Sequence, residues 1–267
     1  MSRVYERQKQ ARKDLQQLWE HPGQVSVIHY SCESFFDRPD GSSPRVTSIA
    51  VRNLKTAQTQ SFSIHKYSEL RGLSADELEG HYNELEKEML ENFFALANER
   101  KEHKWLHWNM RDENYGFHAL ELRCRILGGE PYVIQNANKF DLSRILIGIY
   151  GKAYIGHPRL EVLMDRNKIS SKNFKTGVEE AELFDQKNYV ALHQSTLAKT
   201  DVLSNVCQLS FEGELKTNAN WWKLYGHSVS AFMSWFSHHP IIGFGVVALS
   251  LVANIIFFIQ LLIGGTE

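Results

Sequence analysis

Cysteine is scarce in this chain of 267 residues, and its three copies, Cys32, Cys124 and Cys207, lie far apart. They form no closely spaced pair of the kind that holds zinc, and an odd number of free thiols indicates a reducing compartment. A charge imbalance is also missing, because the formal net charge is only −1. No overall field therefore draws the protein to nucleic acid, and any such binding must come from a local patch.

Several common motifs are missing as well. No G-x-x-x-x-G-K-[ST] loop surrounds the glycines near Gly151, and Ser195 has no G-x-S-x-G elbow, which excludes a P-loop and an α/β-hydrolase nucleophile. The N-terminus has no apolar segment typical of a signal peptide. We therefore expect the bulk of the chain to lie in the cytoplasm.

A long apolar run stands near the C-terminus. Residues 241–263 carry no charge, and their polar side chains are Ser250, Asn254 and Gln260. A helix of this length can cross a hydrocarbon core of about 30 Å. A buried packing helix is the alternative, but such a helix normally shows a continuous polar stripe. The run predicts a single-pass protein of the cell membrane with its N-terminal domain in the cytoplasm.

One face of that run suggests self-association. Gly243, Ser250 and Asn254 recur at helical spacing, together with Val247 and Phe257. Small and amide side chains on one stripe let helices approach and hydrogen-bond in a membrane. The alternative is a lipid-facing helix that tolerates one amide. We expect a homo-oligomer in which Gly243, Ser250 and Asn254 form the contact.

The segments at either end of the expected soluble domain are amphipathic. Residues 216–240 are rich in tryptophan and other aromatics, which favour the headgroup zone, although they could instead belong to the domain core. Residues 1–24 contain a basic helix over 3–20 that could touch anionic lipid or phosphate. Glu6, Asp14 and Glu20 dilute its charge, so a solvated helix docked on the domain is favoured.

The middle of the chain alternates strand and helix patterns. The expected strands are Val25–Tyr30, Val46–Val51, Gln60–His65, Trp105–Trp108 and Tyr132–Ile134. The expected helices are a long one after the capping box that begins at Ser74, then Asn114–Leu127, Leu142–Tyr150, Pro158–Asn167, Val178–Asp185 and Tyr189–Leu209. Three strands, a helix, a strand, a helix, a strand and then helices predict an α/β domain with a mixed sheet.

This order resembles that of the RNase H-like fold, and the residues resemble its DEDD-type 3′–5′ exonuclease branch. The resemblance covers roughly residues 25–207, within an expected domain of 25–215. The family's first Asp-x-Glu is matched by Ser31-Cys32-Glu33. Its later motifs are matched by Asn109 and Asp112, and by Asp201 at a longer spacing from His193.

The resemblance implies a site for two Mg²⁺ or Mn²⁺ ions held by Glu33, Asp112 and Asp201. The departures weaken it, because Ser31 replaces a bridging aspartate and Lys199 adds a positive charge. The alternative gives each acid an ordinary role: Glu33 as a solvent-facing loop acid, Asp112 as the N-cap of the helix that follows it and Asp201 as a surface helix charge. We favour this alternative, and therefore a catalytically degenerate domain.

Ligand binding could survive without catalysis. Asn109, Arg144, Arg159 and Lys199 are the candidate ligand-binding residues. Two of them belong to a set of basic residues in the helical half: Arg144, Lys152, Arg159, Arg166, Lys168, Lys172 and Lys175. This set could bind a nucleotide or nucleic acid, or it could be an ordinary solvated face.

Three functions remain open. The first is a membrane-anchored binding or effector protein, for example in defence or stress, that recognises a nucleotide, nucleic acid or partner protein. The second is an active metal-dependent exonuclease tethered to the membrane, with Mg²⁺ or Mn²⁺ as cofactor. The third is a tail-anchored scaffold. The incomplete carboxylate set and the polar stripe in the apolar run favour the first.

Overall fold

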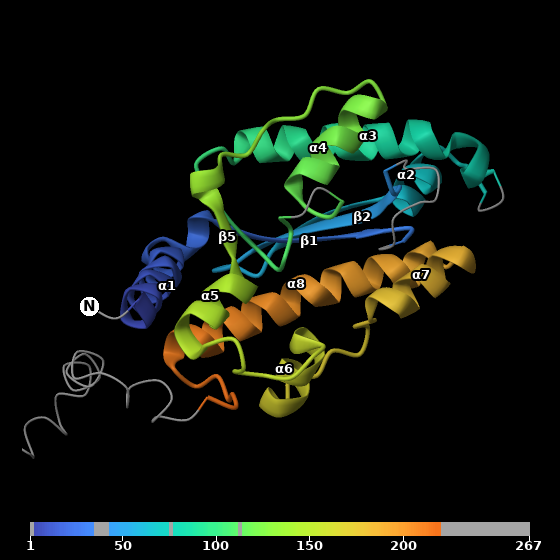
Figure 1. Ribbon diagram of the computed structural model, residues 1–267. Coiled ribbons are helices and arrows are strands. Elements are labelled where there is room, and N and C mark those ends of the chain that lie inside the picture. Colours follow the sequence, from blue (N-terminus) through green and yellow to red (C-terminus); the bar gives the residue numbers. More distant parts are fainter. Residues whose placement is uncertain (1–2, 35–42, 75–76, 112–113, 220–267) are drawn as a thin grey trace, which may run out of the picture.

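The computed structural model describes residues 3–34, 43–74, 77–111 and 114–219 (Figure 1). Within them the chain forms an α/β fold with a mixed five-stranded sheet and eight α-helices. The strands are β1 (Val25–Cys32), β2 (Val46–Asn53), β3 (Thr59–Ser63), β4 (Lys104–His107) and β5 (Lys139–Asp141). The helices are α1 (Arg3–Glu20), α2 (Ile64–Leu70), α3 (Leu78–Glu99), α4 (Phe117–Ile126), α5 (Leu142–Tyr150), α6 (Arg159–Asn167), α7 (Gly177–Asp185) and α8 (Tyr189–Glu212).

The sheet has the order β3-β2-β1-β4-β5. The first three strands form an antiparallel meander, whereas β1, β4 and β5 run parallel to one another. The central strand β1 is buried along its whole length, which explains its nearly continuous apolar and small sequence. Because β1, β4 and β5 are parallel, their carboxyl ends lie at one edge of the sheet.

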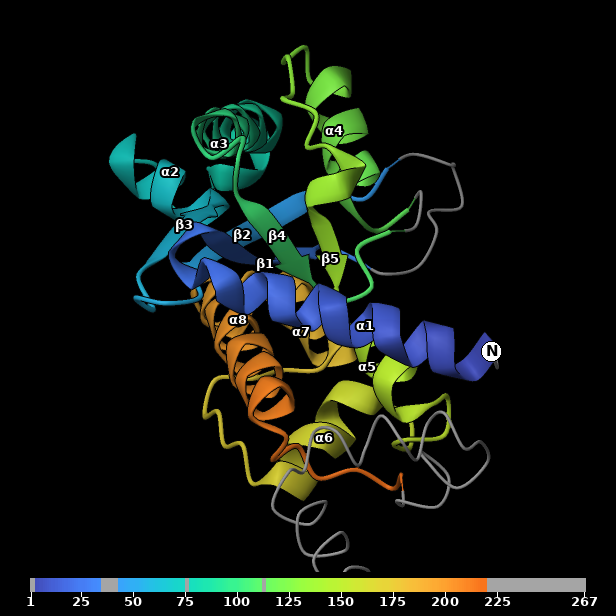
Figure 2. The same ribbon diagram turned by 90° about the vertical axis from the view of Figure 1, so that its left-hand side faces the viewer.

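Helices cover both faces of the sheet. Helices α3 and α4 lie on one face, and α8 lies on the other with α5, α6 and α7 (Figure 1). Figure 2 shows α1 lying across α5 and α8. Two hydrophobic clusters result: one joins β1 to α3 and α4 through residues such as Ile28 and Leu85, and the other joins it to α1, α5 and α8 through residues such as Val27 and Leu203.

Most of the expected elements are confirmed. The helices over 3–20 and Leu142–Tyr150 have the expected bounds, and the remaining expected helices and the first four strands agree to within a few residues. The strand expected at Tyr132–Ile134 is wrong, because the fifth strand is β5, Lys139–Asp141. The strand expected to reach His65 ends at Ser63, where the short helix α2 begins.

The crossing of α1 and α5 depends on a glycine. A β-carbon added to Gly148 would lie 2.5 Å from Cβ of Ala11, far inside van der Waals contact. We therefore expect Gly148→Ala to push α1 away from α5 and to lower the free energy of unfolding by about 1–3 kcal/mol, the usual cost of overpacking. Urea denaturation of the purified chain measures this change.

Gly80 in α3 provides a matched control. It is also a helical glycine, but it is exposed and a β-carbon there would meet nothing within 4 Å. Gly80→Ala should raise the free energy of unfolding by about 0.5–1 kcal/mol, because alanine loses less entropy in a helix. Equal effects of the two substitutions would show that the α1–α5 contact is not tight.

Candidate functional site

The position that the resemblance assigns to a metal-binding aspartate holds Ser31, whose hydroxyl contacts a second hydroxyl. Ser31 at the end of β1 and Thr196 on α8 are both fully buried, and their side-chain oxygens are 2.9 Å apart. The backbone oxygen of Ser31 accepts a hydrogen bond from the Thr47 hydroxyl at 2.9 Å. These groups satisfy one another and bring no negative charge, so they do not offset the charge of a divalent ion.

Two of the three candidate catalytic carboxylates, Glu33 and Asp201, lie far apart. Glu33 is buried and its Oε1 accepts a hydrogen bond from the Arg45 backbone at 3.1 Å. Asp201 is exposed and pairs with Arg52 at 2.8 Å. Because Arg52 lies opposite Val27, six residues before Glu33 on β1, the two acids are separated by about 20 Å of strand. Asp112 lies outside the described residues.

A pair of Mg²⁺ or Mn²⁺ ions does not fit the residues that the structure describes. Within 3–34, 43–74, 77–111 and 114–219, no three His, Cys, Asp or Glu side chains gather as a metal-binding group. Two divalent ions need several convergent carboxylates to offset four positive charges. The alternative role expected for Asp201, a surface helix charge, is confirmed, because Asp201 is exposed on α8 and pairs with Arg52. The solvent-facing position expected for Glu33 is wrong, because Glu33 is buried and its carboxylate accepts a hydrogen bond from the Arg45 backbone.

Lys199 has a structural partner. Its Nζ lies 2.7 Å from Oε2 of Glu180 on α7, and both side chains are buried. The other oxygen of Glu180 accepts a hydrogen bond from the Ser195 hydroxyl at 2.7 Å. This buried ion pair links α7 to α8. The contacts therefore give Lys199 a packing role, and they place it away from the hollow described next.

A hollow lies at the carboxyl ends of β4 and β5. We call it the β4–β5 hollow; it measures about 280 Å³. Its lining residues are His107, Met110, Arg111, Phe117, His118, Asn136, Lys139, Asp141 and Arg144. Three cations and one carboxylate therefore surround it, apart from the two histidines. Ligands of open α/β sheets typically bind at the carboxyl ends of the strands.

Asp141 organises this hollow. Its Oδ1 caps α5 by accepting from Ser143 N at 3.0 Å, and it also accepts from Asn109 N at 3.2 Å. Its Oδ2 pairs with the guanidinium of Arg111. Asn109 has a positive φ of 55°, a conformation that asparagine tolerates better than most residues. The candidate ligand residue Asn109 is thus held in the turn beside the hollow.

The cations differ in how firmly they are held. Lys139 donates to Asn136 Oδ1 at 3.2 Å and lies 5.0 Å from the centre of the Phe117 ring. Arg144 is exposed on the first turn of α5. Asn109 donates to Asp141, and Arg144 lines the same hollow as Asp141. The structure thus places two candidate ligand residues, Asn109 and Arg144, at one site.

His107 contributes a neutral ring. Its Nδ1 accepts a hydrogen bond from Met110 N at 3.2 Å, so the proton of the neutral imidazole is on Nε2. Burial lowers the pKa of His107 to about 4; nearby Asp141 opposes this shift, and the cations Arg111 and Lys139 reinforce it. His107 is therefore uncharged near neutral pH and can donate a hydrogen bond through Nε2 without adding to the charge.

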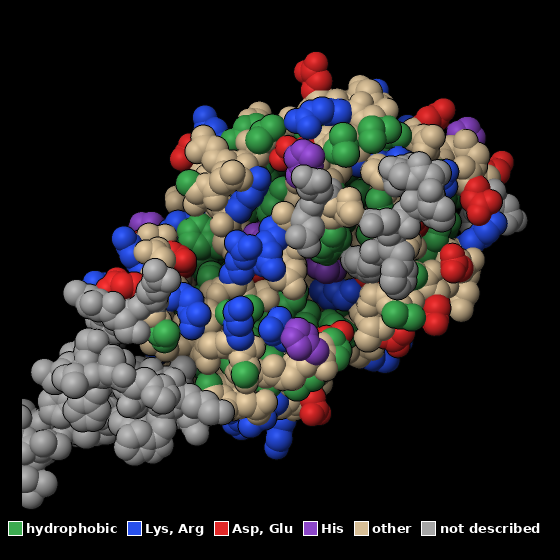
Figure 3. Space-filling view, viewed as in Figure 1, with side chains coloured by type: hydrophobic (Ala, Val, Ile, Leu, Met, Phe, Trp, Pro, Cys, Tyr) green, Lys and Arg blue, Asp and Glu red, His purple; other side chains and the backbone are tan. Residues whose placement is uncertain are grey.

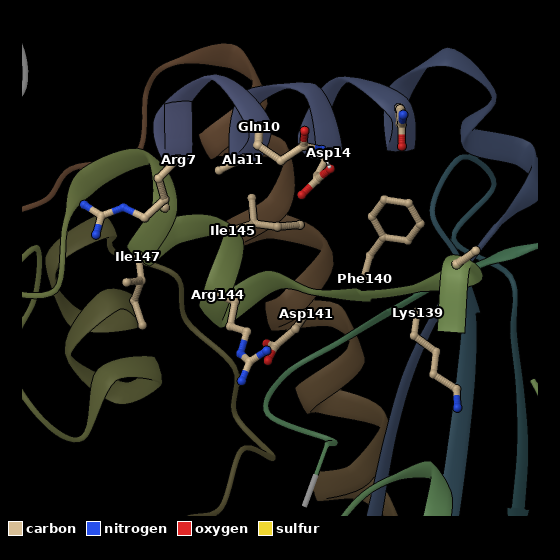
Figure 4. A pocket seen from close by; sticks show the side chains of 13 residues that line it. Arg7, Gln10, Ala11, Asp14, Lys139, Phe140, Asp141, Arg144, Ile145 and Ile147 are labelled. Atoms are coloured by element: carbon tan, nitrogen blue, oxygen red, sulfur yellow. Dashed lines mark hydrogen bonds between the residues drawn. The ribbon is translucent and has the colours of Figure 1, made fainter. Parts of the chain in front are cut away.

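A second hollow lies on the other side of β5, against α1. We call it the α1 groove; it measures about 650 Å³. Lys139, Asp141 and Arg144 border both hollows. Figure 4 shows Phe140 and Ile145 pointing toward α1, while Arg144 and Asp141 lie together on the opposite side of the strand. The alternation along β5 thus separates an apolar side from a charged one.

The remaining candidates lie elsewhere. The Arg159 guanidinium donates to the Lys152 backbone oxygen at 3.4 Å, and Arg159 is not among the residues that line the β4–β5 hollow. Gly243, Ser250 and Asn254 lie outside the described residues, as do 220–240. Sequence reasoning missed Arg111, Lys139 and Asp141. The available signal is polar side chains at the end of a strand, and it is hidden because the sequence pattern places the fifth strand at Tyr132–Ile134 instead of Lys139–Asp141.

None of the helices in the part of the chain that the structure describes is long and apolar enough to cross a membrane. The run 241–263 lies beyond that part. The chain matches no family model, no curated protein and no solved structure.

Proposed function

We propose that this protein is a membrane-anchored binding protein whose domain resembles the RNase H-like fold but has lost metal-dependent catalysis. In this proposal the β4–β5 hollow holds a phosphate group of a nucleotide or of a nucleic-acid end. The observation that carries it is the grouping of Arg111, Lys139 and Arg144 around one carboxylate at the carboxyl ends of β4 and β5.

The order of elements supports the fold assignment. Three strands, a helical segment, a fourth strand, a helix, a fifth strand and further helices follow one another along the chain. Ser31 supports the loss of catalysis, since it stands where the family has a metal-binding aspartate and its hydroxyl contacts the uncharged Thr196 hydroxyl instead. Binding without cleavage is the function that these two observations favour together.

The chemistry of the hollow suits a phosphate group. Arginine and lysine donate charge-assisted hydrogen bonds to phosphate oxygens, and these are roughly twice as strong as neutral ones. His107 near neutral pH adds a donor without changing the charge. With Asp141 offsetting one cation, the surplus of about two positive charges matches the charge of a phosphate monoester near pH 7.

The anchor is proposed from the sequence of residues 241–263. In this proposal the run crosses the cell membrane with the domain in the cytoplasm, and the stripe of Gly243, Ser250 and Asn254 brings copies together. Ligand binding in the domain would then be coupled to the association of the spans. This arrangement supports an effector or sensor role at the membrane.

Charge reversal at Arg144 tests the proposed ligand site. Arg144 occupies the first turn of α5, where an acidic residue is favourable, so Arg144→Glu should fold normally. We expect it to weaken binding of AMP and of a 5′-phosphorylated oligonucleotide by about 30-fold or more, because a cation is replaced by an anion. Isothermal titration of the full chain measures both affinities.

Lys55→Glu is the matched control. Lys55 is exposed in the turn between β2 and β3, away from the β4–β5 hollow. Its replacement by glutamate changes the net charge of the protein by the same amount as Arg144→Glu. It should leave both affinities unchanged. Equal losses in the two variants would indicate a general effect of charge, and unchanged binding in Arg144→Glu would refute the site.

A further inference from the structure

The basic residues of this chain are unevenly distributed. Residues 142–178 contain seven lysines and arginines but only two acids, Glu161 and Asp165, although the whole chain has a net charge of −1. Figure 3 shows Lys and Arg gathered over α5 and α6, whereas Asp and Glu gather toward the end formed by α2 and α7. The domain is therefore electrically polar, with a positive end at α5 and α6.

The described chain ends at this positive end. Asn218 N donates to the Tyr154 backbone oxygen at 2.7 Å, and the Asn167 side chain bonds both backbone groups of Lys216. The Arg166 guanidinium also pairs with the Asn218 side chain. Four hydrogen bonds thus fix residues 216–218 on α6 and on the turn that precedes it. Everything that follows in the sequence, including the apolar run, must start from this surface.

Three exposed cations surround this exit point. Lys152 lies in the turn after α5, Arg166 is in the last turn of α6, and Lys216 belongs to the final described segment. None of them lines the β4–β5 hollow, so the proposed ligand does not need them. We call these three side chains the basic exit face.

We propose that the basic exit face docks on the anionic lipid headgroups of the membrane that holds the apolar run. This inference rests on the proposed function, because it assumes that residues 241–263 anchor the chain. Lysine and arginine side chains are attracted to an anionic leaflet, each strengthening association by roughly fivefold. Since the chain leaves the domain here, an anchor joined through residues 220–240 keeps this face within reach of the lipid.

Docking would fix the orientation of the domain. With α6 against the headgroups, the acidic end at α2 would point away from an anionic leaflet, so both ends of the charge distribution favour the same orientation (Figures 1 and 3). The interaction is electrostatic and exposed, and therefore should weaken as salt shortens the Debye length.

The test uses the full chain reconstituted into vesicles of phosphatidylcholine alone or with about one-third phosphatidylserine. A fluorophore is attached at Ala153→Cys, an exposed position beside Lys152, and headgroup-linked nitroxide lipid acts as quencher. Cys32, Cys124 and Cys207 are buried and should remain unlabelled. We expect quenching to be at least threefold stronger in the anionic vesicles and to fall to the neutral level at high salt.

Two controls test whether the quenching depends on the label position and on the three cations. A label at Glu69→Cys, exposed near the end of α2, should show little quenching in either vesicle. The triple variant Lys152→Glu, Arg166→Glu, Lys216→Glu should remove the difference between the vesicles at position 153. All three sites are exposed, and although Arg166→Glu removes the bond to the Asn218 side chain, the other three hydrogen bonds at the exit use the backbone of Lys216 and Asn218 and remain, so the fold should be retained.

The possible failures separate the two proposals. Full-length protein that does not float with either vesicle would overturn the membrane anchor and this inference with it. Protein that floats normally but shows equal quenching at position 153 in both vesicles would overturn the docking face alone. The same holds if the triple variant behaves like the wild type.

Discussion

Replacing Arg123 by methionine should lower the free energy of unfolding by about 3–5 kcal/mol. Arg123 on α4 forms a two-pronged pair with Glu86 on α3, with N–O distances of 2.8 and 2.6 Å. Glu86 is completely buried and also accepts a hydrogen bond from Val46 N at 2.7 Å. Removing the guanidinium leaves a buried carboxylate without its counter-charge, and breaking a buried ion pair in this way is strongly destabilising.

A double variant distinguishes this cause from lost packing. Arg123→Met combined with Glu86→Leu removes both charges, so it should recover part of the loss, although the Val46 amide then lacks its acceptor. Urea denaturation followed by tryptophan fluorescence provides the measurement, since Trp105 is fully buried in the core. A loss below about 1 kcal/mol for Arg123→Met would show that the pair is solvated.

Acid should destabilise the protein strongly between pH 7 and pH 5. Burial lowers the pKa of His107 to about 4 and that of His193 to about 3. Both side chains stay neutral in the folded state while the unfolded chain takes up protons below about pH 6.5. The unfolded state is thereby favoured as pH falls, and the two residues together should lower the free energy of unfolding by about 4 kcal/mol at pH 5.

A variant at His193 isolates half of this effect. Its Nδ1 is 2.5 Å from the Ser48 hydroxyl, and its Nε2 is buried without a hydrogen-bond partner in the described residues. His193→Gln removes the titrating group and should reduce the loss between pH 7 and pH 5 by about 2 kcal/mol. Denaturation midpoints at a series of pH values test this. An unchanged pH slope would mean that His193 is solvated and titrates normally.

The elements that sequence alone predicts well are those with strong local signals. The helix over 142–150 follows Asp141, which caps it, and ends at Gly151 with a positive φ of 88°. The fifth strand lacks such a signal, because β5 has only three residues and two of them are charged. The more apolar Tyr132–Ile134 has higher strand propensity but pairs with no strand in the described part of the chain, which indicates that pairing rather than propensity decides.

The candidate site depended on that fifth strand. Asn109 and Arg144 could be chosen from the sequence, but their meeting point is Asp141, whose position is known only once β5 is placed. The burial of Lys199 against Glu180 is likewise a tertiary contact that no local pattern reveals. Asp201 follows Thr196 by five residues on α8, which turns it about 140° around the helix from the face that meets Ser31.

In the proposed function, this domain binds a phosphate-bearing ligand and does not use metal to cleave it. The most direct measurement is the affinity of the full chain for a 5′-phosphorylated oligonucleotide, first with Mg²⁺ and then with EDTA, with the oligonucleotide recovered and sized afterwards. We predict the same affinity in both conditions and an intact oligonucleotide. Binding that disappears in EDTA, or shortening of the oligonucleotide that Asp112→Ala abolishes, would contradict the account.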